Sequence, residues 1–124
     1  MRQNISSGGA FEPVMGYSRA VRVGNQVHVS GTTARPPAVH GDAYTQSVAV
    51  LDIIEKALGE AGAAMSDVVR TVVYVTDIAD AEAVARAHGE RFSQVLPAST
   101  MVAVTALLTP EMKVEIEAYA VLDG

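Results

Sequence analysis

The first part of the chain alternates apolar and polar residues with the period of a β-strand. Two such runs, Ser18 to Val23 and Gln26 to Gly31, are separated only by Gly24-Asn25. Glycine and asparagine tolerate positive φ, so this pair is typical of a two-residue hairpin turn. The pattern therefore predicts a β-hairpin, preceded by a short flexible N-terminus over about residues 1–13.

Two later segments repeat apolar residues every three or four positions, which predicts two amphipathic helices. The first follows the N-cap candidates Asp42 and Thr45 and runs to Ala61. The second is capped by residues 77–80 and runs to about Val95, before a proline-containing stop. Their polar faces carry charged residues, so each helix is expected to bury only one side.

Three further runs predict the strands that complete one sheet: Val68 to Thr76, Met101 to Ala106 and Lys113 to Val121. The element order is then ββαβαββ, an α+β fold in which both helices cover one face of a mixed sheet. The opposite face would carry valines together with Glu117 and Tyr119. An uncovered patch of this kind usually marks a protein–protein interface, so the pattern predicts an oligomer.

The composition fits a single domain, residues 1–124, with one core. Of the 124 residues, 49% are hydrophobic, which excludes a disordered chain. The net charge of −5 disfavours binding to nucleic acid, and no window approaches the roughly 20 apolar residues of a membrane span. There is no Cys, and the three His lack the spacing of a metal site. We therefore expect a cytoplasmic protein with no metal, no nucleic-acid partner and no membrane segment.

The order and spacing of several short segments carry a further signal: Gly16-Tyr17-Ser18-Arg19-Ala20-Val21, Gly24-Asn25, Val29-Ser30-Gly31, Ala61-Gly62, Asp67-Val68-Val69, Val75-Thr76-Asp77, Pro97-Ala98 and Val114-Glu115-Ile116-Glu117-Ala118. With them the chain resembles the Rid family of reactive intermediate deaminases, also called YjgF-type or endoribonuclease L-PSP proteins. The resemblance implies a chorismate-mutase-like fold and a homotrimer with a central sheet barrel and three intersubunit ligand clefts. It also implies cofactor-free hydrolysis of 2-imino or enamine acids to 2-oxo acids and ammonia.

The resemblance further implies roles for individual residues. Glu117 matches the acidic residue that positions or activates the hydrolytic water. Tyr17, Ser30 and Gly31 match positions that line the ligand cleft. Glu115 lies two positions from Glu117 on the same strand face, about 6.6 Å away by strand rise, and the two carboxylates would raise each other's pKa. Spacing alone favours an interface ion-pair role for both glutamates, and the resemblance reverses this for Glu117 only.

One motif departs from the family pattern. The family clamps the substrate carboxylate with the Arg of a Pro-Ala-Arg-Ser motif, and here the Arg position is Ser99. Ser99, Thr100 and Met101 are placed to contact a small ligand by hydrogen bonds and packing, but not to pair with a carboxylate. The chain therefore looks like a Rid subgroup without this Arg, and Arg19 is the first candidate to replace it.

Two main functions follow as hypotheses. The first is cofactor-free hydrolysis of a small imine, enamine or carbonyl compound, with Glu117 handling the water. The alternative is a non-catalytic trimer that binds a small ligand or a partner after losing the clamp. An RNA-cleaving protein is a weaker third, because the chain is acidic and has no basic stripe.

Overall fold

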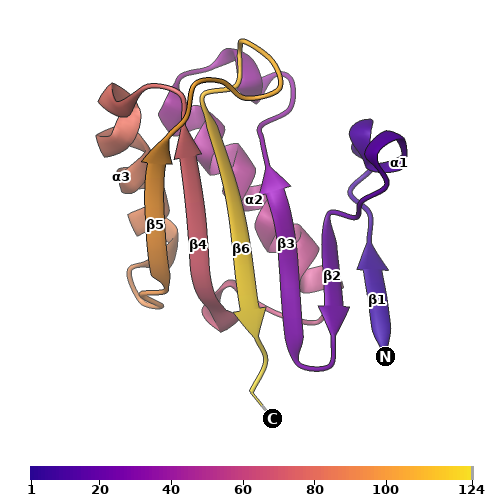
Figure 1. Ribbon diagram of the computed structural model, residues 1–124. Coiled ribbons are helices and arrows are strands. Elements are labelled where there is room, and N and C mark those ends of the chain that lie inside the picture. Colours follow the sequence, from indigo (N-terminus) through magenta and orange to yellow (C-terminus); the bar gives the residue numbers. More distant parts are fainter. Residues whose placement is uncertain (124) are drawn as a thin grey trace.

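One mixed sheet with the two long helices on a single face organises residues 1–123, the part of the chain described by this computed structural model (Figure 1). The six strands lie in the order β1-β2-β3-β6-β4-β5. Strands β1 to β3 are Arg2–Ile5, Ala20–Val23 and Gln26–Thr32; β4 to β6 are Val68–Val75, Ala98–Ala103 and Val114–Val121. The helices are α1 (Phe11–Met15), α2 (Ala43–Glu60) and α3 (Ala81–Phe92), with short 3₁₀ turns at Ala38–His40, Met65–Asp67 and Ile78–Asp80. The predicted α+β class and single sheet are confirmed.

The hairpin forms where the Gly-Asn pair predicted it. Strands β2 and β3 pair antiparallel from Val23↔Gln26 to Ala20↔Val29, and Gly24 adopts the positive φ of +60° that the turn requires. The N-terminus differs from the expectation of a flexible segment over about residues 1–13. Residues Arg2 to Ile5 form β1, which adds to the edge of β2, because that edge offers unpaired backbone groups.

Helix α2 covers the centre of the sheet. Asp42 caps it, since its side chain accepts a hydrogen bond from the Thr45 backbone N–H at 2.8 Å. Its apolar side is buried against the inward residues of the strands, and both sets form one core that includes Leu51, Ile54, Leu58, Val73 and Ile116. Helix α3 packs beside α2 on the same face (Figure 1).

Strand β5 begins three residues earlier than the sequence predicted, at Ala98 rather than Met101. The reason is its parallel pairing with β4, in which Arg70 faces Ala98 and Val75 faces Ala103. Pairing with the central strand β4 thus determines where the edge strand β5 begins. Ser99, Thr100 and Met101 all lie within it.

The face of the sheet opposite the helices is open in this chain, as the alternation in the last strand predicted. Along β6, Val114, Ile116 and their even-numbered successors are buried, whereas Glu115 and Glu117 are only partly covered. None of the helices within residues 1–123 is long and apolar enough to cross a membrane.

Candidate active site

A cavity of about 760 Å³ is lined by residues of α1, of the segments around β2 and β3, and of the loop before β6. Its lining includes Tyr17 and Arg19 from the segment just before β2, Ser30 and Gly31 from β3, Arg35 from the loop after β3, and Glu115 from β6. Four residues expected at the site, Tyr17, Arg19, Ser30 and Gly31, are therefore brought together. Glu117 is not among the lining residues, although Glu115 is.

A bulge in β3 opens the cavity to Glu115. The register of β3 against β6 shifts between Val29 and Thr32, so Ser30 and Gly31 leave the regular ladder. The Glu115 carboxylate occupies the space that a side chain at Gly31 would need, because a Cβ there would collide with Glu115 Oε2. Glycine at position 31 therefore leaves room for the Glu115 side chain to lie against β3.

Ser30 and Tyr17 are held by their neighbours. The Ser30 hydroxyl donates to the Ser18 carbonyl at 2.7 Å, which orients it along the strand pair. The Tyr17 hydroxyl accepts a hydrogen bond from Arg19 Nη2 at 3.1 Å. Accepting this bond leaves the phenolic hydrogen of Tyr17 available to another acceptor.

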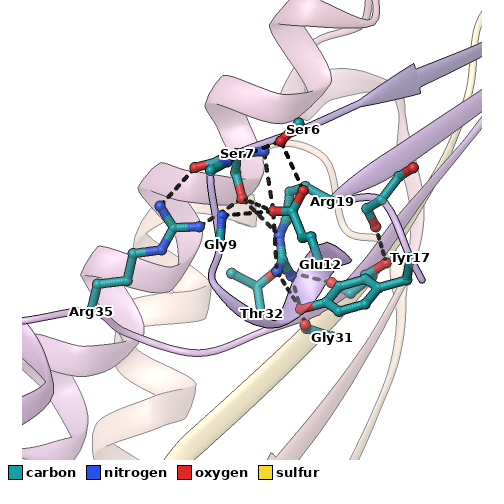
Figure 2. Close-up of polar contacts among 12 residues, drawn as sticks. Ser6, Ser7, Gly9, Glu12, Tyr17, Arg19, Gly31, Thr32 and Arg35 are labelled. Atoms are coloured by element: carbon teal, nitrogen blue, oxygen red, sulfur yellow. Dashed lines mark hydrogen bonds and ion pairs between the residues drawn. The ribbon is translucent and has the colours of Figure 1, made fainter. Parts of the chain in front are cut away.

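Arg19 is buried, at 5% exposure, and its N–H groups are engaged within the chain (Figure 2). Nε donates to Ser7 Oγ at 3.2 Å, and Nη1 donates to the Gly31 carbonyl at 2.8 Å and to Thr32 Oγ1 at 3.0 Å. Nη2 bonds to Tyr17 and lies 4.0 Å from Glu12 Oε2. A guanidinium has five N–H donors, so Arg19 has little left for a bound carboxylate. This arrangement does not support Arg19 as the replacement clamp.

Glu12 is the counter-ion that the sequence analysis missed. Burial alone would raise its pKa, but hydrogen bonds from the Ser7 side chain, the Gly9 backbone, the Ser6 side chain and the Ser7 backbone together lower the pKa to about 2. The Ser7 hydroxyl joins the charges, because it donates to Glu12 Oε2 at 2.7 Å and accepts from Arg19 and Arg35. These bonds hold the segment before β2 to Arg19 and Arg35 (Figure 2).

The two glutamates of β6 have different environments. Burial, and then the charge of Glu117, raise the pKa of Glu115, while Arg19 opposes the rise. Glu117 instead accepts hydrogen bonds from Tyr119 at 2.8 Å and Tyr74 at 3.3 Å. The alternation along β6 places both carboxylates on the same face of the sheet. The bulge at Gly31 makes them different, because Glu115 lies in the cavity whereas Glu117 is bonded to two tyrosines.

The clamp position lies elsewhere in this chain. Strands β6 and β4 separate β5 from β3, so Ser99, Thr100 and Met101 are remote from the cavity of the same chain and do not line it. The Thr71 hydroxyl donates to Ser99 Oγ at 2.8 Å and lies 2.8 Å from His88 Nε2. Burial lowers the pKa of His88, which favours the neutral imidazole in this hydrogen-bonded chain.

Over residues 1–123, no three His, Asp or Glu side chains are grouped closely enough to hold a metal ion. The chemistry that the cavity offers is that of one carboxyl group with a raised pKa, a phenol and a hydroxyl. Such a set can move protons and orient water beside a polar ligand.

Known proteins resemble this chain over nearly its whole length. The profile of the family described as Endoribonuclease L-PSP matches residues 8–122. The 3-aminoacrylate deaminase RutC of Acinetobacter baylyi is 33% identical over 90% of this chain and 91% of its own. The 2-iminobutanoate/2-iminopropanoate deaminase of Dermatophagoides farinae is 31% identical over 96% and 95%. The crystal structure of Rv2704 from Mycobacterium tuberculosis, a member of the YjgF/YER057c/UK114 family, is 47% identical, with a TM-score of 0.92 over 98% of this chain and 100% of that one. The chain therefore belongs to the Rid family, also called the YjgF or endoribonuclease L-PSP family.

Proposed function

We propose that the cavity hydrolyses a small imine, enamine or carbonyl compound without a cofactor, and that Glu115 is the group that handles the water. The observation that carries this proposal is the position of Glu115, half-buried in the cavity beside Tyr17 and Gly31 with a raised pKa. Glu117, which the sequence favoured for this role, has both carboxylate oxygens bonded to tyrosines. The names of two relatives, which are deaminases of 3-aminoacrylate and of 2-imino acids, support a reaction at a C–N bond.

The proton movements follow from this assignment. Glu115 accepts a proton from water as the oxygen adds to the C=N carbon, and delivers that proton to the imine nitrogen, which leaves a neutral carbinolamine and an ionised Glu115. Glu115 then takes the hydroxyl proton of the carbinolamine and passes it to the amine nitrogen, so that the C–N bond breaks, ammonia leaves and the C=O bond forms. A base whose pKa lies above the ordinary glutamate value is better matched to both transfers near neutral pH. Tyr17 can donate its free hydrogen to the polar group of the substrate.

A pair of isosteric variants tests the assignment. Glu115→Gln should lower the rate of ammonia release by about 10²–10⁴-fold, the usual size of general acid–base catalysis. Glu117→Gln is the matched control, because Glu117 lies two residues further along the same face of β6. Its rate of ammonia release should stay within about 3-fold of wild type. A loss in Glu117→Gln alone would return the role to that residue. If neither variant changes turnover, neither glutamate handles the water and the assignment fails. If wild type turns over no imine or enamine, the non-catalytic binding trimer replaces the proposed reaction.

We also propose that the protein works as a homotrimer with a small-molecule ligand at each subunit interface. The open sheet face supports an assembly, because Val23 and Val121 are exposed on the strands and the Tyr74–Glu117–Tyr119 cluster is only partly buried. A second copy could then bring Ser99 of its β5 towards the cavity. Light scattering should give three times the 13.0 kDa chain mass; a monomer would contradict the shared cleft.

A further inference from the structure

Large apolar side chains surround the mouth of the cavity. Helix α1 supplies Phe11, Val14 and Met15, and the loop before β6 supplies Leu108 and Met112. Met15 is 77% exposed and Leu108 is 73% exposed. Exposed apolar surface of this kind is unfavourable in water, so a ligand that covers it gains hydrophobic contact.

The arginine side chains that line the cavity already form hydrogen bonds within the chain. Arg19 and Arg35 are the only cationic residues among the lining residues within 1–123. Arg19 is bonded as described above, and Arg35 donates to the Ser7 carbonyl at 2.9 Å and to Ser7 Oγ at 2.6 Å. A carboxylate entering the cavity would therefore meet Glu115 without a free guanidinium, and a desolvated anion without a partner is strongly disfavoured.

The size of the cavity points in the same direction. Its volume of about 760 Å³ lies within the range of about 300–1,000 Å³ that is typical of small-molecule sites. A short imino acid would leave most of this space, and the apolar mouth, unfilled. A longer molecule with one polar end would fill both parts.

From these features we propose that the cavity takes an uncharged amphipathic carbonyl, imine or enamine compound rather than a 2-imino carboxylate. Its polar group lies against Glu115 and Tyr17, and its apolar part lies against α1 and Leu108. This inference rests on the proposed function, since it names the substrate class of the same cavity.

Two matched probes test the proposal with the full-length protein. Hexanamide and hexanoate have the same apolar chain and differ in the charge of the head group. In NMR titrations at about pH 8, where hexanoate is ionised, hexanamide should bind about 10-fold more tightly. Met15→Ser and Leu108→Ser should each weaken hexanamide by about 3–10-fold.

The control is Ile78→Ser, because Ile78 is also apolar and 65% exposed but does not line the cavity. It should leave the affinity for hexanamide unchanged. Equal binding of the two probes, or an equal loss in Ile78→Ser, would overturn the proposal. So would a Met15→Ser variant that changes the oligomeric mass but not the affinity, since α1 would then be covered by another copy.

Glu115→Gln separates this inference from the proposed reaction. Removal of the negative charge should bring the two probe affinities to within about 3-fold of each other, whether or not turnover is measured. If that ratio changes as expected while wild type releases no ammonia, the reaction fails and the ligand class stands. If Glu115→Gln abolishes turnover but wild type prefers hexanoate, the reaction stands and the ligand class fails.

Discussion

The buried Glu12–Arg19 network predicts that one carboxylate in the N-terminal segment stabilises the whole domain. We consider the isosteric change Glu12→Gln, which keeps the shape but removes the charge. Four hydrogen bonds reach the carboxylate from Ser6, Ser7 and Gly9. The glutamine would present an NH₂ group to some of these donors and leave Arg19 buried without its counter-ion.

The magnitude follows from the pKa of Glu12. The difference between 4.5 and about 2 corresponds to about 3.4 kcal/mol, at 1.36 kcal/mol per pKa unit. The N-terminal segment lies at the protein surface, and solvent screens part of these interactions. We therefore expect Glu12→Gln to lower the free energy of unfolding by about 1–3 kcal/mol at neutral pH. For a chain of this length, that corresponds to a fall in Tm of about 3–15 °C.

The direction of the pKa shift determines how the contribution of Glu12 to the free energy of unfolding changes with pH. The pKa of Glu12 is lowered in the folded state, so its contribution is complete above the ordinary value of 4.5 and is lost as the pH falls towards about 2. Urea unfolding of wild type and Glu12→Gln should therefore differ most above pH 4.5 and converge near pH 2.

Glu55→Gln is the matched control. Glu55 pairs with Arg91 at 2.7 Å, but its side chain is 58% exposed, so its loss should cost less than about 1 kcal/mol. The reasoning is refuted if Glu12→Gln is as stable as Glu55→Gln at neutral pH, or if the difference from wild type persists at the lowest pH.

Three further outcomes are expected. Gly31→Ala should displace the Glu115 carboxylate and lower turnover by about 10²-fold, whereas Gly59→Ala, with no atom within 4 Å of the added Cβ, should leave turnover unchanged in the same ammonia assay. In the pH profile of kcat/KM, the midpoint of the fall at acid pH should lie above the ordinary glutamate pKa of 4.5, because the base must be ionised and the pKa of Glu115 is raised. Arg19→Gln should move this midpoint to still higher pH, because Arg19 lowers the pKa of Glu115. An unmoved midpoint would show that Arg19 does not act on Glu115. Thr71→Val should lower the free energy of unfolding by about 1–2 kcal/mol, because it removes the hydroxyl shared by Ser99 and His88, and Thr71→Ser should restore most of the loss in urea unfolding.

Local signals in the sequence were sufficient for the architecture. The Gly24-Asn25 turn, the Asp42 cap and the alternation from Val114 to Val121 each depend on neighbouring residues, and all three formed as predicted. Family membership also follows from sequence order, because many weak segments at fixed spacing are jointly specific. The trimer, the cytoplasmic location and the site roles stay predictions.

Long-range contacts decided the rest. Strand β1 forms because the edge of β2 accepts it, and β5 begins early because β4 pairs with it; neither partner is visible in the local pattern of the segment itself. Arg19 and Glu12 are only seven positions apart in the sequence. They become buried, and the N–H groups of Arg19 find their acceptors, only when the first residues fold against β3. Glu115 and Glu117 are equivalent by alternation along one strand. The bulge at Gly31 distinguishes them, because it lets one carboxylate into the cavity while Tyr74 and Tyr119 bind the other.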